Sequence, residues 1–256
     1  MMPSPARFLV GVLGGMGPLA TVDLLQKIIA ATPAERDQQH VPVAVWNVPQ
    51  IPDRQRALAG IGASPLPALL DGVERLNRLD ISHLIIPCNT AHHWFDELQA
   101  ASRAPVLHIA DVTLIQAQAA LADTSSPRVG LIATHGTLAA GWYQRRLAAL
   151  DIETVLPDEQ EMDNLFVPGC YAVKRGDVAA GGGLFGQLAE RLAARGATHL
   201  ILACTEVAPG LAAMQSRWLA RSIDSTEALA RHCVALWREQ AGGNEKPPDG
   251  WDRTGG

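Results

Sequence analysis

Residues 82–88 read SHLIIPC and residues 198–204 read THLILAC, so an apolar run ends in cysteine twice in the same chain. Small polar residues follow each cysteine. A short apolar run of this kind is typical of a strand that is buried on both faces of a parallel sheet. We therefore predict two equivalent strands that present Cys88 and Cys204 at their carboxyl ends.

A second pair of similar segments precedes these two strands. Residues 10–17 read VGVLGGMG, and residues 129–136 read VGLIATHG. Strand-like and helix-like segments alternate after each of them, which favours parallel sheets covered by helices. We predict an α/β fold of two similar Rossmann-like domains, each a parallel sheet with helices on both faces, related by pseudo-twofold symmetry. Ligands of such sheets bind outside the carboxyl ends of the strands, so the active site is expected in the cleft between the domains.

The repeat also predicts where the domains begin and end. An N-terminal α/β domain carries Cys88, a C-terminal α/β domain carries Cys204, and the final helix packs back on the first half. The predicted domains are residues 1–115 with 222–241, residues 116–221, and a flexible tail at 242–256 that is rich in Gly, Pro and Asp.

The composition of the chain limits the kinds of molecule that it is expected to bind. The chain has 256 residues, of which 48% are hydrophobic and 18% charged, as in a globular protein, and its net charge is −5. Without a basic stripe, neither nucleic acid nor a membrane is an expected partner. Because no apolar run is long enough to span a bilayer and the first residues lack a signal-peptide layout, we expect a cytoplasmic protein.

The paired cysteines suit the inversion of a stereocentre. That reaction needs a base on one face of a carbon and an acid on the other, and a thiolate with a thiol can exchange these roles. Each cysteine is also predicted at a helix N-terminus, where the helix dipole lowers the pKa of a thiol. The site must stabilise developing charge with hydrogen-bond donors. Candidate donors in loops after strands are Asn89, Thr90, Thr134, Thr137 and Thr205.

Two cations are candidates for holding a substrate carboxylate. Arg54 follows two prolines that fix its loop, and Lys174 lies in a predicted loop. An arginine can grip a carboxylate with two parallel hydrogen bonds, and a lysine offers a compact charge. The alternative for each is a solvated surface cation.

Other motifs favour structural roles. Cys170 and Cys233 are interpreted as buried filler. For His40, His92 and His93, a capping or packing role is preferred to metal binding. Adjacent histidines on a helix, such as His92 and His93, point about 100° apart and seldom bind one metal ion. Residues 15–20 fit the G-x-G-x-x-A form of a dinucleotide loop, but the next strand lacks the acidic residue that would hold a ribose.

Six motifs follow one another along the chain: GGMGPLAT at 14–21, DQQH at 37–40, IPDR at 51–54, PCNTAH at 87–92, ATHGT at 133–137 and CTE at 204–206. In this order they resemble the aspartate/glutamate racemase family, with the aspartate racemases as the most similar branch. The motifs of dedicated glutamate racemases, Asp-Ser-Gly and Pro-Tyr-Gly, are missing.

The resemblance implies racemisation without pyridoxal phosphate or metal, by a homodimer of two Rossmann-like halves. It implies that Cys88 and Cys204 are the acid/base thiols and that Arg54 and Lys174 hold the substrate carboxylates. Further residues then line the pocket: Met16, Asn89, Thr90 and Thr205. The chain departs from the family at Ala203, where glycine is common, which leaves the substrate side chain open.

Three alternatives to an aspartate racemase follow from the sequence. A racemase of the same family with broader specificity fits the same motifs. A pyridoxal-phosphate racemase would need a pocket lysine, and Lys174 is the one candidate among the three lysines. From a different class, the chain could be a nucleotide- or amino-acid-binding module that does no chemistry.

Overall fold

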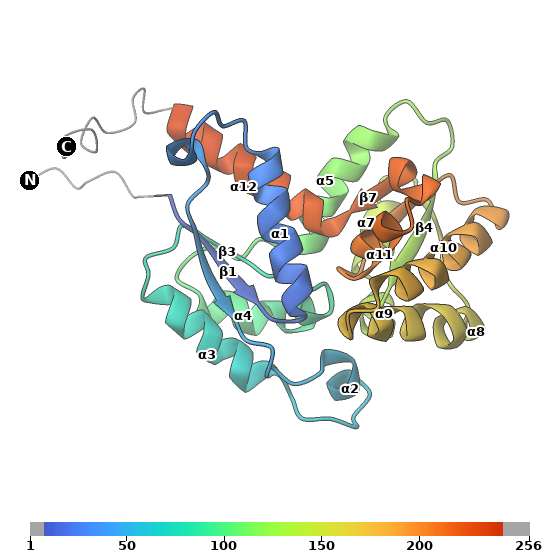
Figure 1. The fold of residues 1–256 in the computed structure, drawn as a ribbon, viewed down its shortest axis with the longest axis horizontal. Coiled ribbons are helices and arrows are strands. Elements are labelled where there is room, and N and C mark those ends of the chain that lie inside the picture. The colour runs from blue at the N-terminus through green and yellow to red at the C-terminus, as the bar shows by residue number, and fades with distance from the viewer. Residues whose placement is uncertain (1–7, 243–256) are drawn as a thin grey trace, which may run out of the picture.

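The computed structural model describes residues 8–242, and it forms two lobes that lie side by side (Figure 1). Each lobe contains a parallel sheet with its own helices. We call the lobe built on the sheet nearer the N-terminus the first lobe, and the other the second lobe. The predicted α/β fold with two similar halves is confirmed.

The two sheets have the same strand order around their centres. The first has the order β2-β1-β3 and the second the order β5-β4-β6-β7, and all neighbouring strands are parallel. The strands are β1 (Val10–Gly14), β2 (Val43–Asn47), β3 (His83–Ile85), β4 (Arg128–Ala133), β5 (Glu153–Val155), β6 (His199–Ala203) and β7 (Ser222–Asp224). The repeated sequences therefore fall on equivalent strands, with β1 matching β4 and β3 matching β6.

Helices connect the strands in both lobes. Those of the first half are α1 (Pro18–Ala31), α2 (Arg54–Leu58), α3 (Leu66–Asn77), α4 (Phe95–Ala101) and α5 (Ile109–Leu121). Those of the second half are α6 (His135–Ala140), α7 (Trp142–Ala148), α8 (Glu159–Glu161), α9 (Val167–Lys174), α10 (Val178–Ala194), α11 (Val207–Ala213) and α12 (Ser225–Gly242). Shorter turns are 3-10 helices at Asp37–Gln39, Thr90–Trp94 and Arg217–Arg221 and a π-helix at Met162–Phe166. Within residues 8–242, no helix is both long and apolar enough to span a membrane.

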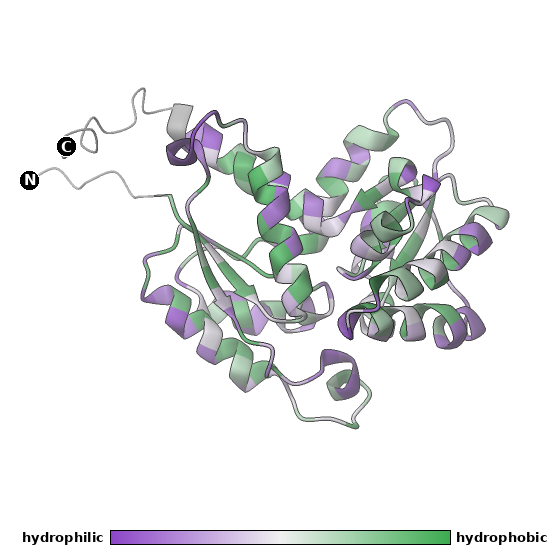
Figure 2. Cartoon of the chain, in the orientation of Figure 1, coloured by the Kyte–Doolittle hydropathy of each residue, from purple (hydrophilic) through white to green (hydrophobic). Residues whose placement is uncertain are grey.

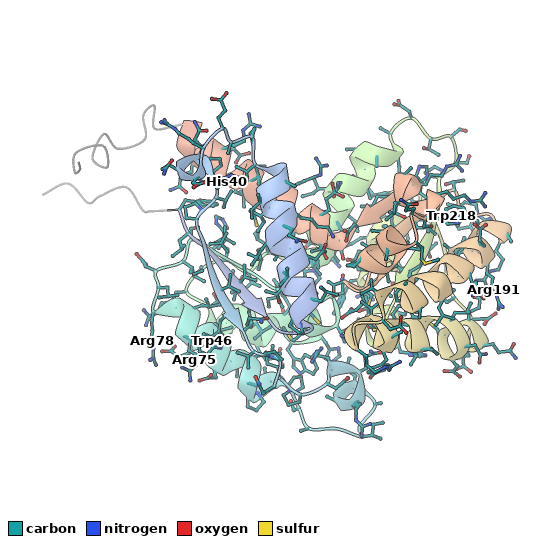
Figure 3. All side chains as sticks on the ribbon, viewed as in Figure 1. His40, Trp46, Arg75, Arg78, Arg191 and Trp218 are labelled. Atoms are coloured by element: carbon teal, nitrogen blue, oxygen red, sulfur yellow. The ribbon has the colours of Figure 1, made fainter. Side chains whose placement is uncertain are left out.

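Hydrophobic residues are concentrated in the strands and along parts of the helices (Figure 2). Every residue of β1 is buried, as expected of a central strand covered on both faces. Charged side chains cover the outside. On the outer face of α3, Arg75 and Arg78 are exposed, and the guanidinium of Arg75 lies 4.7 Å from the ring centroid of Trp46 (Figure 3).

The C-terminal helix α12 packs on the first lobe. Its residues Leu229 and Cys233 are buried in one apolar cluster with Val10 of β1 and Leu24 of α1. Residues 222–224 form β7, which pairs with β6 and so belongs to the second sheet. The chain therefore re-enters the first lobe at α12, and not at residue 222 as the predicted boundary has it. The other domain boundaries stay a prediction. Residues 243–256, which hold nearly all of the predicted flexible tail, lie outside the described residues.

Two helices of the second lobe approach each other at a glycine. A Cβ atom on Gly182 of α10 would lie 2.0 Å from the carbonyl oxygen of Gly210 in α11. The adjacent Gly183 faces open space, because a Cβ atom on it would meet no neighbouring element of residues 8–242 within 4 Å. The close packing of these helices therefore requires glycine at 182 but not at 183.

We expect Gly182→Ala to lower the free energy of unfolding by about 1–3 kcal/mol, because the methyl group forces the helices apart. The matched change Gly183→Ala is expected to raise it by about 0.5–1 kcal/mol, because alanine favours the helix. Urea denaturation of both variants measures the difference. Equal effects of the two changes would contradict the proposed packing.

Candidate active site

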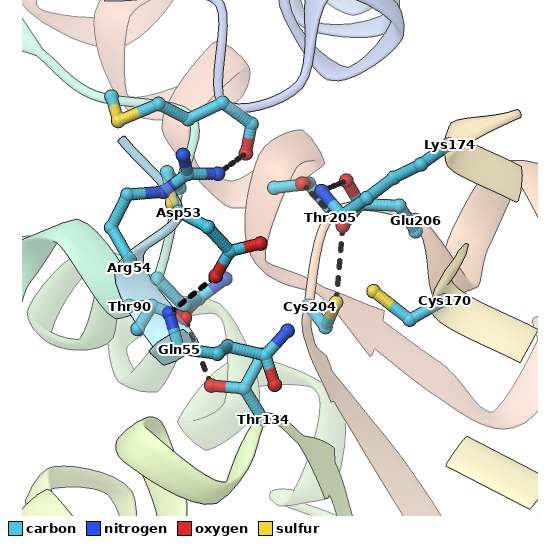
Figure 4. A pocket seen from close by; sticks show the side chains of 13 residues that line it. Asp53, Arg54, Gln55, Thr90, Thr134, Cys170, Lys174, Cys204, Thr205 and Glu206 are labelled. Carbon is cyan, nitrogen blue, oxygen red and sulfur yellow. Dashed lines mark hydrogen bonds and ion pairs between the residues drawn. The ribbon is translucent and has the colours of Figure 1, made fainter. Parts of the chain in front are cut away.

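A small cavity lies between the two lobes, at the carboxyl ends of their strands (Figure 4). Cys88 reaches it from the end of the β3 segment and Cys204 from the end of β6. Every residue that the sequence singled out for catalysis or substrate binding lines this cavity, apart from Thr137, which lies behind Thr134. The lining residues are Met16, Asp53, Arg54, Gln55, Cys88, Asn89, Thr90, Thr134, Cys170, Lys174, Cys204, Thr205 and Glu206.

The segment after Cys88 differs from the prediction. The cysteine precedes a 3-10 turn and not an α-helix, and Asn89 at its N-cap makes no capping hydrogen bond. The side chain of Asn89 instead accepts a hydrogen bond from the Tyr143 hydroxyl (2.6 Å) and donates one to the Ser225 hydroxyl (3.0 Å). Both partners come from beyond the first sheet, so tertiary contacts, and not a helix cap, fix this loop between the lobes.

The buried ring of His92 holds the backbone of Cys88. The Ile109 N–H donates to Nε2 of His92 (3.2 Å), so Nδ1 carries the proton and donates to the carbonyl oxygen of Cys88 (3.0 Å). Burial lowers the pKa of His92 from its ordinary value to about 4. The predicted packing role of this histidine fits these contacts.

A chain of hydroxyl groups links the lobes beside the cavity. The Thr90 and Thr134 hydroxyl oxygens lie 2.8 Å apart, and Thr134 donates to the hydroxyl of Thr137 (3.0 Å). Thr134 also caps α6, because its hydroxyl accepts from the Thr137 N–H (3.2 Å). The Thr90 and Thr134 side chains are thus fixed in place at the cavity wall.

Cys204 lies in a charged surrounding. Its thiol donates to a Glu206 carboxylate oxygen (3.1 Å), and the other oxygen of Glu206 accepts from the ammonium group of Lys174 (2.5 Å; Figure 4). The hydroxyl of Thr205 also donates to Glu206 (3.2 Å). The carboxylate is 8% exposed, so this is a largely buried ion pair with a thiol attached to it.

The surroundings of Cys204 raise its pKa well above the ordinary value. The contact with the Cys170 thiol and burial are the main causes, and the negative charge of Glu206 adds to them, while Lys174 opposes them. The prediction that a helix dipole lowers the pKa of this thiol is therefore wrong. In the absence of substrate, Cys204 holds its proton.

The guanidinium of Arg54 is bound by its own loop. It donates to the carbonyl oxygens of Ile51 (3.2 Å), Pro52 (3.0 Å) and Met16 (3.3 Å). Its Nε–H, which is buried, has no hydrogen-bond partner among residues 8–242. An unpartnered buried donor at a cavity wall is free to bind an acceptor on a ligand.

Sequence reasoning missed four lining residues. The sequence predicts Cys170 as filler, but α9 brings it to the cavity, where it contacts Cys204. The sequence assigns no role to Glu206, and only the fold shows its contacts with Cys204 and Lys174. Asp53 and Gln55 flank Arg54, and the Asp53 carboxylate accepts from the Tyr171 hydroxyl of the second lobe (3.1 Å).

The sequence profile of the Asp/Glu/hydantoin racemase family matches residues 13–233. The chain belongs to this family. Its structure is similar to that of Picrophilus torridus aspartate racemase, with a TM-score of 0.77 and 30% identity, over 92% of this chain and 98% of that one. The broad specificity amino-acid racemase RacX of Bacillus subtilis (strain 168) is 26% identical over 239 residues, covering 90% of this chain and 98% of RacX.

Glutamate racemases share the fold at lower identity. The isoform RacE1 of Bacillus anthracis is 19% identical, with a TM-score of 0.65 over 93% of this chain and 84% of that one. The family resemblance inferred from the motifs is confirmed, and with it the arrangement of two α/β lobes.

We expect the family's fold in this chain to lose stability in mild acid through His92. Between pH 7 and 5 the unfolded histidine takes up a proton while the folded one, with a pKa of about 4, does not. This difference lowers the free energy of unfolding by about 2 kcal/mol at pH 5. In His92→Gln, the pH dependence measured by urea denaturation is expected to shrink by that amount. His93→Gln, which changes an exposed neighbour, is the control, and an equal effect of both changes would contradict the assignment.

We expect Glu206→Gln to lower the pKa of Cys204, because it removes a negative charge and leaves Lys174 unpaired. Alkylation of Cys204 by iodoacetamide, followed by mass spectrometry, should then begin at a lower pH than in the unmodified chain. Glu190→Gln changes an exposed carboxylate that pairs with Arg217 and is the matched control. An unchanged alkylation profile in Glu206→Gln would show that the carboxylate does not govern the thiol.

Proposed function

We propose that the chain is an amino-acid racemase that interconverts L- and D-aspartate, or a similar acidic amino acid, with Cys88 and Cys204 as paired acid and base. The observation that carries this proposal is that both thiols line one cavity, each from the carboxyl end of an equivalent strand in its own lobe. Membership of the racemase family and the similarity to an aspartate racemase support it.

The two thiols divide the chemistry. One sulfur, as thiolate, takes the α-proton, and the electron pair of the C–H bond stays on carbon as a carbanion stabilised by the adjacent carboxylate. The other thiol gives its proton to the opposite face, which forms the new C–H bond and leaves a thiolate. Because Cys204 holds its proton in the free protein, we propose Cys204 as the first donor and Cys88 as the first acceptor.

Substrate carboxylates are proposed to bind Arg54 and Lys174. The Nε–H of Arg54 has no partner among residues 8–242 and can donate directly to a substrate carboxylate. The other N–H groups of Arg54 can do so only after their hydrogen bonds to the loop carbonyls are broken. Lys174 already pairs with Glu206. A second carboxylate must therefore compete with Glu206 for the ammonium group.

This competition favours a second candidate, a racemase of broader specificity. If Lys174 stays paired with Glu206, the cavity has only one cation, Arg54, available for a substrate carboxylate. An acidic side chain then binds less favourably than it would with two available cations, and uncharged amino acids become better substrates. The similarity to RacX, whose name states broad specificity, supports this alternative. Rates with aspartate, glutamate and uncharged amino acids separate the two candidates.

The proposed reaction does not use pyridoxal phosphate. A lysine that forms a Schiff base must be a neutral amine, whereas Lys174 is paired with Glu206. Burial alone lowers the pKa of this lysine, but the charge of Glu206 raises it above its ordinary value. The expected homodimer and cytoplasmic location stay predictions from the family resemblance and the sequence.

We expect the chain to exchange the α-hydrogen of L-aspartate in D₂O and to form D-aspartate, as followed by NMR and chiral chromatography. Cys88→Ala and Cys204→Ala should each lower the rate of racemisation by about 10²–10⁴-fold, because each removes one acid/base group. Cys233→Ala, which changes a thiol buried in the first lobe away from the cavity, should keep the rate.

Two results would contradict the proposal. Full racemisation by either cavity variant would exclude the two-thiol mechanism, provided that circular dichroism shows a native fold. Absence of α-hydrogen exchange with every common amino acid would exclude racemisation itself.

A further inference from the structure

Three potential metal ligands meet at one wall of the cavity. The Sγ atoms of Cys170 and Cys204 and a carboxylate oxygen of Glu206 all lie within 4.8 Å of one another, and all three residues are buried. They come from separate elements, since Cys170 lies on α9, Cys204 follows β6 and Glu206 precedes α11. In Figure 4 the thiol of Cys170 points toward that of Cys204. The proposed racemase mechanism uses Cys204 as an acid/base group and assigns no role to Cys170.

We propose that Cys170, Cys204 and Glu206 form an inhibitory binding site for Zn²⁺. Two thiolates and a carboxylate are a donor set that zinc accepts, and the cavity leaves a fourth position for water. Around a tetrahedral zinc ion, neighbouring sulfur and oxygen ligands lie about 3.6–3.8 Å apart. Ligand atoms that lie up to 4.8 Å apart therefore need to approach by about 1 Å, whereas the Cys204 sulfur and the Glu206 oxygen, which lie 3.1 Å apart, need to separate by about 0.5 Å. Hard cations such as Mg²⁺ avoid sulfur and should not bind.

The charge of the cluster favours zinc as its occupant. Without metal, the negative charge of Glu206 and the positive charge of Lys174 cancel, and a thiol that carries its proton adds no charge. Binding of zinc forms two Zn–S bonds and one Zn–O bond, and the two thiol protons leave to solvent. The cluster then holds Zn²⁺, two thiolates, Glu206 and Lys174, and its net charge is still zero. Zinc therefore enters this largely buried site without leaving an uncompensated charge there.

Zinc bound in this way would inhibit the proposed reaction. The sulfur of Cys204 would be a metal ligand and could no longer give or take the α-proton. The inhibition rests on the proposed function, whereas metal binding itself does not, so the two are tested separately.

Binding is measured with Co²⁺ as the spectroscopic probe, on the full chain in a phosphine reductant that keeps the thiols reduced. We expect sulfur-to-cobalt charge-transfer absorption that one equivalent of Zn²⁺ abolishes and excess Mg²⁺ does not. Cys170→Ser should weaken binding of Co²⁺ by more than about tenfold, because even changes outside the ligand shell of a metal site cost ten- to a hundredfold. Cys88→Ser, which changes the other thiol of the same cavity, should leave the absorption in place.

An unchanged affinity for Co²⁺ in Cys170→Ser, or loss of the absorption in Cys88→Ser, would overturn the proposed site. Absence of any thiolate absorption with Co²⁺ would do the same. These outcomes do not depend on whether the chain is a racemase.

Inhibition is tested by measuring the rate of racemisation at increasing concentrations of Zn²⁺. The rate of each protein is compared with the rate of the same protein in the presence of a chelator. The unmodified chain should lose activity and regain it when the chelator is added. Cys170→Ser should need at least about tenfold more Zn²⁺ for half inhibition, in line with its weaker binding. Equal sensitivity of the two proteins would show that zinc inhibits somewhere else and would overturn the inhibitory role.

Discussion

One buried chain of hydrogen bonds joins the two sheets at the point where their cysteines lie. The Tyr143 hydroxyl donates to Asn89, Asn89 donates to Ser225, and Ser225 donates to the carbonyl oxygen of Leu202 in β6 (2.9 Å). The loop that follows Cys88 is thereby held against the strand that presents Cys204. Since each of these groups is buried, breaking the chain would leave polar atoms without partners, at about 1–3 kcal/mol for each. The geometry of the cavity depends on this connection.

Around that connection the two halves share the arrangement of their strands, but different side chains surround the two cysteines. Both cysteines follow the strand next to the central one, and both line the same cavity. The surroundings of Cys88 are set by the neutral ring of His92, which binds its carbonyl oxygen. The surroundings of Cys204 are set by an ion pair and a second thiol. A repeated fold has therefore placed two cysteines at equivalent positions beside different neighbours.

The sequence was sufficient for the features that depend on local pattern. Strand-like runs that end in cysteine predicted the parallel sheets and the placement of Cys88 and Cys204, because burial on both faces forces apolar residues into continuous runs. The order of motifs predicted the cavity wall. Features that depend on long-range packing were not predictable. Asn89 is a good capping residue in isolation, and only the fold shows that Tyr143 and Ser225 compete for it. Cys170 has no nearby partner in sequence, and its meeting with Cys204 depends on how α9 packs.

Both ends of the described chain belong to the first lobe. Phe8 and Val234 lie in one apolar cluster with β1, whereas the second sheet is formed by residues between them. In topological terms the second lobe is an insertion into the first, tethered at both of its ends. The two crossings of the chain between the lobes therefore restrain how far the lobes can separate.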